Sequence, residues 1–143
     1  MRGAAIKHFV IDASVAVAWC FADETTGFTE KVLELASKAA EVCVPPLWPF
    51  EVANALLAAE RRKRITAAQA TSFLSRIVGL PVVVELQQVS RAHDQVLSLA
   101  RLHGLTVYDA AYLELAMGRG LPLATLDDRL KQAAIAAGTA LIA

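Results

Sequence analysis

Short apolar runs alternate with longer segments of helical periodicity along the whole chain. The short runs predict strands at 8–12, 42–44, 82–85, 122–124 and 140–142. The intervals between them predict helices at about 15–21, 29–40, 47–63, 66–79, 90–103, 109–117 and 127–137. This alternation predicts an α/β fold, a three-layer sandwich in which helices flank a mostly parallel central sheet of four to five strands.

Local sequence marks some helix ends and indicates where to look for a site. Thr66 is a typical N-cap, and the sequence Gly79-Leu80-Pro81 ends the helix that Thr66 begins. Gly138 closes the last helix. In open parallel sheets, ligands bind beyond the carboxyl ends of the strands, so residues that directly follow strands are the first candidates.

Composition limits the class of protein. With 143 residues, the chain is long enough to form one domain, 1–143, around a substantial core. The apolar fraction is 56% and the mean hydropathy is +0.46, yet nowhere do about 18 apolar residues follow one another as in a membrane span. Arg2 and Lys7 precede an apolar run as in a signal peptide, but Asp12 interrupts it, which predicts a cytoplasmic protein.

Charge and cysteine content exclude two further classes. Because 14 Lys and Arg balance 14 Asp and Glu, any nucleic-acid binding must come from a local patch. The basic segment 60–64, ERRKR, is expected to be a solvated helix end, an assignment compatible with attraction of phosphates. Cys20 and Cys43 do not indicate a disulfide framework, and we expect two buried free thiols.

Four carboxylates stand out by their surroundings. Asp12 ends the first strand within the apolar sequence FVIDASVAV, and Asp127 in LATLDDRL follows the fourth. Asp109 opens a helix in TVYDAAYLELA. Glu51 lies in an apolar helical segment, with Asn54 three residues later on the same face. Since an ionised carboxylate in apolar surroundings is costly unless it is paired, coordinated or hydrated, these residues indicate a site.

Helix capping offers a structural explanation for the three aspartates, each of which lies near the start of a helix. Two neighbours weaken this explanation, because Ser14 could cap the first helix and Asp128 the last. Glu51 lies too deep in its predicted helix to be a cap, and buried glutamates are rare unless paired. For the aspartates, both explanations stay open at this point.

A bound divalent cation would allow four acids to lie together at one crevice. Their mutual repulsion would raise their pKa values and destabilise the fold, and a bound cation removes the conflict. Ligands that are all oxygens favour Mg²⁺ or Mn²⁺. Zinc is disfavoured because His8, His93 and His103 have no ligand-like spacing. Such a cation can activate water for in-line attack on a phosphodiester and stabilise the developing charge.

The motifs VIDASV, PFEVANAL, YDAAYLELA and LATLDDRL, in this order, resemble those of the PIN-domain ribonucleases, particularly toxins of the VapC type. The resemblance covers essentially the whole chain, and the ordered set is more specific than any single motif. It implies a single PIN-like domain and a Mg²⁺- or Mn²⁺-dependent endoribonuclease. Similar proteins hydrolyse phosphodiester bonds of single-stranded or looped RNA and leave a 5′-phosphate and a 3′-hydroxyl.

The same resemblance implies the roles of individual residues. The catalytic acids and metal ligands would be Asp12, Glu51, Asp109 and Asp127, with Asp12 and Asp109 the most direct ligands. The polar side chains around them would be Ser14, Asn54 and Thr125. Because Thr125 sets the register of a Thr-x-Asp arrangement, Asp127 is preferred to Asp128 as the fourth acid.

Toxins of this type also imply partners. These are the RNA substrate, a second copy of the chain in a homodimer, and a small VapB-like antitoxin as inhibitor. The C-terminal segment of the antitoxin would cover a hydrophobic groove and block the crevice. Among the aromatic residues of the sequence are Trp19, Phe21, Trp48 and Phe50. We expect most of these four to pack in the core and some to line a partner surface.

Other functions fit the sequence less well. A phosphotransfer module also places acids at strand ends, but usually has adjacent acids after the first strand, where Asp12 stands alone. A phosphatase with an aspartyl nucleophile would have a second Asp at the position of Ser14. A non-catalytic α/β binding module gives no reason for Glu51 in apolar surroundings. The nuclease is therefore the leading hypothesis.

Overall fold

The computed structural model describes residues 5–143, so Arg2 lies outside the described part of the chain. Its centre is a four-stranded sheet in the order β3-β2-β1-β4, and every strand pair is parallel. The strands are β1 (His8–Ile11), β2 (Glu41–Val44), β3 (Val82–Val84) and β4 (Leu123–Ala124). The prediction of a mostly parallel sheet is confirmed.

Helices fill the connections between the strands. They are α1 (Ala13–Ala18), α2 (Gly27–Lys38), α3 (Trp48–Arg61), α4 (Ala67–Val78), α5 (Val89–Arg91), α6 (Leu97–His103), α7 (Val107–Arg119) and α8 (Asp128–Ala136). A 3-10 turn, η1 (Ala22–Glu24), and a π-helical segment, η2 (Ala92–Val96), complete them. None of the helices in the described range is long and apolar enough to cross a membrane.

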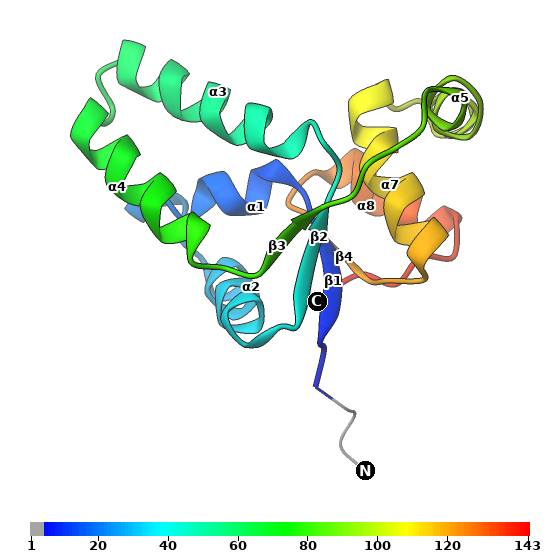
Figure 1. The fold of residues 1–143 in the computed structure, drawn as a ribbon, viewed down its shortest axis with the longest axis horizontal. Helices are drawn as coiled ribbons and strands as arrows, with labels where there is room; N and C mark the ends of the chain where they lie inside the picture. Colours follow the sequence, from blue (N-terminus) through cyan, green and yellow to red (C-terminus); the bar gives the residue numbers. More distant parts are fainter. Residues whose placement is uncertain (1–4) are drawn as a thin grey trace.

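The sheet lies between two helical layers, with α1 to α4 on one side and α5 to α8 on the other (Figure 1). This is the expected three-layer sandwich. β1 is central, and Phe9, Val10 and Ile11 are almost completely buried because helices cover both faces. On α7, residues 110–116 are all buried, so this helix packs against the core over nearly two turns. The site-bearing segments therefore start from a rigid frame.

Several predicted boundaries are confirmed and others are wrong. Thr66 caps α4 in a capping box with Gln69, as expected of an N-cap. The predicted fifth strand, 140–142, is reduced to one parallel bridge between Leu123 and Leu141. The predicted helix 90–103 exists, but η2 interrupts its α-helical hydrogen bonding between α5 and α6.

The predicted core residues separate into buried and exposed groups. Phe21 and Trp48 are buried, whereas Phe50 is 77% exposed. Both cysteines are free, as expected, but only Cys43 is fully buried. In the basic segment 60–64, residues 61–64 are exposed, which agrees with a solvated helix end.

Candidate active site

The predicted acids come from segments that begin at the carboxyl ends of the strands. The first turns of α1, α3 and α7 face these upper ends of the sheet (Figure 1). Asp12 directly follows β1, and Thr125 directly follows β4. Because Ile11 pairs with Ala124 in parallel register, Asp12 and Thr125 are brought side by side. The sheet therefore joins residues that are 113 positions apart in the sequence.

Asp12 is held by hydrogen bonds from both of these segments. Ser14 Oγ donates to Asp12 Oδ1 (2.5 Å), and Thr125 Oγ1 donates to Oδ2 (2.6 Å). The Val15 N–H donates weakly to Oδ1 at 3.4 Å, so Asp12 is also the N-cap of α1. The suggestion that Ser14 caps this helix is wrong, because the Ser14 hydroxyl is used to orient Asp12 instead.

Burial dominates the electrostatics of Asp12, which is only 5% exposed. Desolvation raises the pKa of Asp12 to about 6, although the hydrogen bonds from Ser14, Thr125 and Val15 act in the opposite direction. The negative charge of Asp109 raises the pKa of Asp12 further. Asp12 and Asp109 are therefore close enough to repel each other.

The segment after β4 is arranged around Thr125. The Thr125 hydroxyl accepts a hydrogen bond from the Asp127 N–H (3.0 Å), and Ser14 Oγ accepts one from the Leu126 N–H (3.0 Å). Asp127 is half-buried and caps α8 by accepting from Leu130 N–H (3.0 Å), so the suggestion that Asp128 caps this helix is wrong. The Asp128 side chain is 90% exposed and lies 4.0 Å from Lys131.

Glu51 lies nearer to the start of its helix than the sequence indicated. It is in the first turn of α3, where Pro49 occupies one of the first two positions, and its side chain is half-buried. Tyr112 OH, from α7, donates to Glu51 Oε1 (2.5 Å). Burial and the charge of Asp109 raise the pKa of Glu51, while the Tyr112 hydrogen bond lowers it. Burial and the Glu51 carboxylate also raise the pKa of Tyr112, so this phenol stays protonated as a donor.

Asp109 connects the four acids electrostatically. It lies in the first turn of α7, and Thr106 caps that helix by accepting from the Asp109 N–H (3.1 Å). Burial raises the pKa of Asp109, and the charge of Asp127 raises it further. Since Asp109 also acts on Asp12 and Glu51, all four acids belong to one electrostatic cluster. The structure thus brings together the acids that the sequence singled out.

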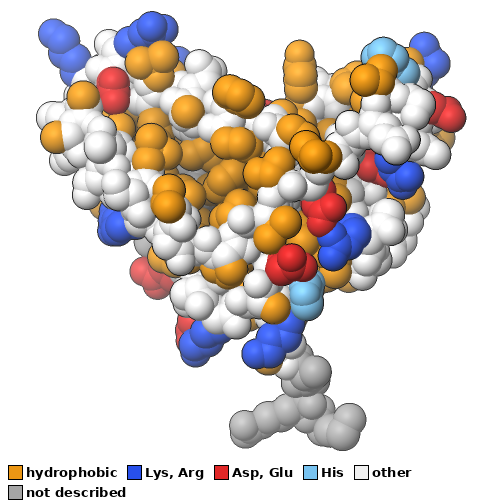
Figure 2. Space-filling view, viewed as in Figure 1, with side chains coloured by type: hydrophobic (Ala, Val, Ile, Leu, Met, Phe, Trp, Pro, Cys, Tyr) orange, Lys and Arg blue, Asp and Glu red, His pale blue; other side chains and the backbone are white. Residues whose placement is uncertain are grey.

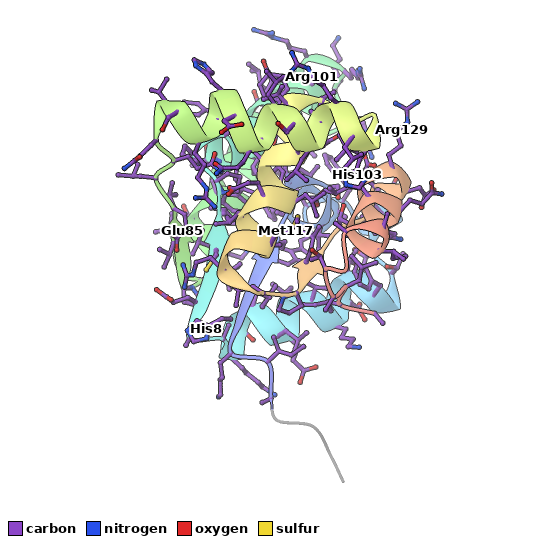
Figure 3. The ribbon with its side chains drawn as sticks, turned by 90° about the vertical axis from the view of Figure 1, so that its right-hand side faces the viewer. His8, Glu85, Arg101, His103, Met117 and Arg129 are labelled. Carbon is purple, nitrogen blue, oxygen red and sulfur yellow. The ribbon has the colours of Figure 1, made fainter. Side chains whose placement is uncertain are left out.

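No positive side chain among the described residues compensates the charge of this cluster. Within residues 5–143, none of the four acids forms an ion pair with Lys, Arg or His. The histidines do not form a group either, since His8 and His103 lie well apart in Figure 3. The result is a concentration of negative charge at the carboxyl end of the sheet.

The donor atoms of this cluster fit a hard dication. In the described part of the chain, no three Asp, Glu, His or Cys side chains are already grouped as a complete metal-binding set. Mg²⁺, however, is commonly bound by one or two carboxylates and several waters, which requires no such preformed cage. Carboxylates with raised pKa values and no cationic partner are the oxygen ligands that such an ion would neutralise.

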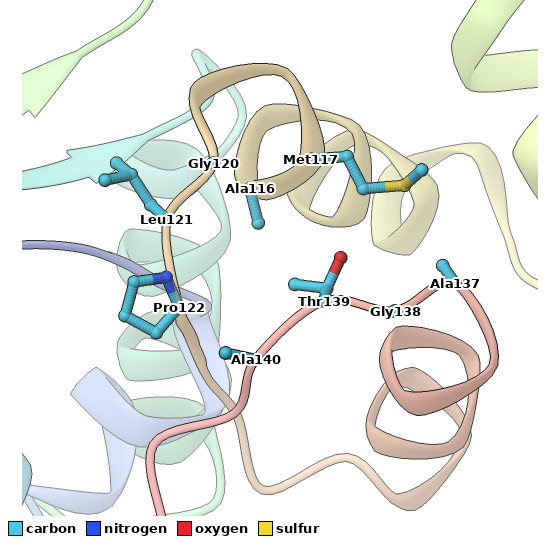
Figure 4. A pocket seen from close by; sticks show the side chains of 9 residues that line it. All are labelled: Ala116, Met117, Gly120, Leu121, Pro122, Ala137, Gly138, Thr139 and Ala140. Carbon is cyan, nitrogen blue, oxygen red and sulfur yellow. The ribbon is translucent and has the colours of Figure 1, made fainter.

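One expected contributor, Asn54, lies outside the cluster. Its side chain is exposed on α3 and makes no hydrogen bond with the residues that the structure describes. An open cavity of about 400 Å³ lies near the amino end of β4 and is lined by small and apolar residues such as Ala116, Pro122 and Ala140 (Figure 4). None of the four acids lines it, and the acids lie instead with the segments that follow the carboxyl ends of the strands.

Two residues of the site were missed in the sequence. Tyr112 lies three positions after Asp109 in YDAAYLELA, and this helical spacing could have indicated a shared face. Thr106 forms a Thr-x-x-Asp pattern with Asp109, which is a capping signal at the start of α7. Nothing in the sequence, however, indicated that Tyr112 contacts Glu51.

Comparisons with known proteins agree with this architecture. The sequence model of the PIN domain family matches residues 9–136. Ribonuclease VapC3 of Pyrobaculum aerophilum is 32% identical over 123 residues, which cover 86% of this chain and 92% of that protein. The match to the PIN domain family extends over the segments that carry all four acids.

Solved structures show the same fold. The crystal structure of PAE2754 from Pyrobaculum aerophilum has a TM-score of 0.67 and 25% sequence identity, covering 90% of this chain and 85% of that one. VapC20 of Mycobacterium tuberculosis, described as a sarcin-ricin loop cleaving toxin, has a TM-score of 0.66 and 18% identity, covering 94% of this chain and 98% of that one. With its sheet, its acids and its sequence in agreement, the chain belongs to the PIN domain family.

Proposed function

We propose that this protein is a metal-dependent endoribonuclease that hydrolyses RNA phosphodiester bonds and acts as the toxin of a toxin–antitoxin pair. One observation carries the proposal: four acids from distant segments form one cluster with no ion-pair partner among the described residues, in a chain of the PIN domain family. The relatives described as a ribonuclease and as an RNA-cleaving toxin support the substrate class. We also propose that it acts in the cytoplasm.

Each residue of the site has its own proposed role. Asp12 and Asp109 would hold Mg²⁺ or Mn²⁺ most directly, and Glu51 and Asp127 would complete its surroundings. When bound, such a cation supplies activation of water and stabilisation of charge on the phosphodiester. Ser14 and Thr125 orient the Asp12 carboxylate by occupying one lone pair on each of its oxygens.

Two exposed arginines support an RNA substrate. Arg101 and Arg129 lie at the upper end of the molecule, toward which the strands run (Figure 3), and both are exposed. Cations at this position can contact the phosphates that flank a bound nucleotide.

Because the acids converge from segments between residues 12 and 127, we also propose that residues 1–143 form a single PIN-like domain.

An apolar groove supports the proposal of an antitoxin partner. Hydrophobic side chains gather between α3 and α4 (Figure 2), around a cavity of about 360 Å³ lined by residues such as Trp48, Val52, Leu74 and Ile77. The buried Trp48 Nε1 has no hydrogen-bond partner within residues 5–143. A VapB-like segment in this groove would cover apolar surface. We propose a homodimer as the assembly of the toxin itself.

Cleavage of a defined RNA with and without a dication tests the catalytic proposal. We expect the purified protein to cut labelled looped RNA with Mn²⁺ or Mg²⁺, to leave 5′-phosphate and 3′-hydroxyl ends, and to be inactive in excess EDTA. Asp127→Asn should reduce cleavage strongly, whereas the matched Asp128→Asn should not, because Asp128 points to solvent. Undiminished cleavage in EDTA would contradict the mechanism.

Binding measurements test the partners separately. Co-expression with the product of the neighbouring gene should give a complex of defined mass in which RNA cleavage is inhibited. Val78 lines this groove and is 82% exposed, so Val78→Glu should weaken this complex without affecting cleavage by the free protein. Light scattering of the toxin alone should give the mass of two chains; the mass of one chain would rule out the homodimer.

A further inference from the structure

Tyr112 lies between two segments of the candidate site. It is on α7, one helical turn after Asp109, and is only 1% exposed. Its hydroxyl donates to Glu51 Oε1 on α3 at 2.5 Å. One buried hydroxyl therefore connects the beginning of α3 with α7.

Glu51 depends on this contact for its orientation. Within residues 5–143, the Tyr112 hydroxyl is the one group that forms a hydrogen bond with the Glu51 side chain. Glu51 is half-buried, so without this bond its long side chain could rotate toward solvent. A hydrogen bond to an ionised carboxylate is among the stronger kinds and fixes direction as well as distance.

The contact also leaves part of Glu51 available. Tyr112 occupies Oε1, whereas Oε2 accepts no hydrogen bond from the described residues. A hydrogen bond to one carboxylate oxygen fixes the direction in which the other oxygen points. Groups that form hydrogen bonds with metal ligands commonly orient them in this way. The negative charge of Asp109 acts on this same carboxylate, which places it at the acid cluster.

We propose that Tyr112 is a positioning residue that holds Glu51 toward the dication of the site. This inference rests on the proposed function, since it concerns how the same acids receive Mn²⁺ or Mg²⁺. A purely structural role would require only the ring, which packs in the core, whereas positioning requires the hydroxyl. The two roles can therefore be separated by Tyr112→Phe, which keeps the ring and removes the oxygen.

Mn²⁺ titration provides a readout that does not depend on cleavage. Free Mn²⁺ is measured by electron paramagnetic resonance as it is added to the metal-free protein. We expect Tyr112→Phe to weaken Mn²⁺ binding by about 10-fold, in the range found for partners of metal ligands. Tyr108→Phe is the matched control on the same helix: its side chain is 64% exposed, and Mn²⁺ affinity should equal that of the wild type. Unchanged or tighter binding by Tyr112→Phe would overturn the inference.

Cleavage kinetics give a second, independent readout. The Mn²⁺ concentration for half-maximal RNA cleavage should rise about 10-fold in Tyr112→Phe, and the rate should recover at saturating Mn²⁺. A general loss of structure would lower the rate at every Mn²⁺ concentration. A reduced maximal rate with an unchanged Mn²⁺ requirement would therefore argue against positioning.

A double-mutant cycle tests whether Tyr112 acts through Glu51. In a Glu51→Gln background, Tyr112→Phe should cause no further loss of Mn²⁺ affinity; additive losses would contradict the inference. If Tyr112→Phe does not fold, Glu51→Asp reports on the same pair, because the shorter side chain cannot keep its carboxylate against Tyr112. We expect about 10-fold weaker Mn²⁺ binding there as well, and wild-type affinity would overturn the inference.

The wild type and Asp12→Asn distinguish this inference from the proposed function. If the wild type binds Mn²⁺, Asp12→Asn does not, and Tyr112→Phe matches the wild type, the positioning role alone is overturned. If the wild type neither binds Mn²⁺ nor cleaves RNA, the proposed function is overturned and the inference with it.

Discussion

Asp12 and Glu114 are buried to the same extent but in opposite electrostatic surroundings. Each is 5% exposed, Asp12 at the carboxyl end of β1 and Glu114 toward the far end of α7. Glu114 pairs with the Arg91 guanidinium and accepts a hydrogen bond from Gln87 Nε2 (3.0 Å). Among the described residues, Asp12 accepts hydrogen bonds only from hydroxyl and backbone groups, and the charged group that acts on it is another acid, Asp109.

This difference separates a structural carboxylate from a candidate ligand. Glu114 lies in a cluster where charges cancel, since the nearby Glu85 also pairs with Arg119. Such pairs attach the segment after β3 to α7 and require no ligand. Around Asp12 the charges add, and burial raises its pKa to about 6. Burial alone does not indicate function here; burial without a counter-charge does.

Substitution of each acid by its amide tests this separation most strongly. Asp12→Asn should lower RNA cleavage by about 100- to 1,000-fold, because the site loses a charge that would hold the cation. Glu114→Gln should leave cleavage by the folded protein at the wild-type rate. Rates are measured on the same labelled RNA at saturating Mn²⁺. Equal losses in both variants would remove the distinction between the two carboxylates.

Removing the positive charge that pairs with Glu114 tests whether this carboxylate has a structural role. Arg91→Gln leaves a buried carboxylate without its cation and should lower the free energy of unfolding by about 3 kcal/mol. Arg62→Ala, at the exposed end of α3, should change it by less than about 0.5 kcal/mol. Urea denaturation measures both. A stability loss for Arg91→Gln no larger than for Arg62→Ala would show that this pair contributes little.

The pH dependence of stability sharpens the comparison in metal-free protein. The folded state keeps the Asp12 proton up to about pH 6, whereas the unfolded chain releases it near 3.8. Between these values the folded state binds more protons, so the free energy of unfolding falls as pH rises. The fall should amount to about 2–3 kcal/mol, with Glu51 and Asp109 acting in the same direction.

Urea denaturation in EDTA between pH 4 and 7.5 measures this effect. Asp12→Asn should flatten the curve, because its amide does not titrate, and saturating Mn²⁺ should flatten it in the wild type by stabilising the ionised acids. A free energy of unfolding that rises with pH over this range in metal-free wild type would contradict the unpaired state of Asp12.

The smallest expected effect comes from removing a hydroxyl that donates a hydrogen bond to Asp12. Thr125→Val removes the donor to Asp12 Oδ2 and the acceptor of the Asp127 N–H. We expect RNA cleavage to fall about 10-fold, since partners of metal ligands commonly contribute this much. Thr139→Val, in the cavity near the amino end of β4, is the control and should cleave normally. Wild-type cleavage by Thr125→Val would show that Asp12 needs no hydroxyl to orient it.

Much of the fold follows from local pattern. The apolar runs at β1 and β2 are fully buried between helices, and such runs are recognisable without tertiary information. The strand predicted at 140–142 failed because a strand needs a partner over several residues, and only Leu141 pairs with Leu123. The π-helical segment η2 was also not predictable, because a change in helical hydrogen bonding leaves no mark in hydrophobic periodicity.

The site was less predictable than the fold. Asp12, Glu51, Asp109 and Asp127 were recognisable as acids at strand or helix ends, but helix capping remained an equal explanation for three of them. The structure shows that Asp12 and Asp127 do cap helices, so the two explanations are compatible.

By itself, the sequence determined the order of strands and helices along the chain, the acids at their ends and the resemblance to a family. These are local properties, since each depends on residues a few positions apart. Only the tertiary structure decided the strand order β3-β2-β1-β4, the contact of Thr125 with Asp12 and that of Tyr112 with Glu51. The physical reason is that charge compensation and hydrogen bonding depend on distance in space, and residues 51 and 112 or 12 and 125 become neighbours only when the sheet and its helices have packed.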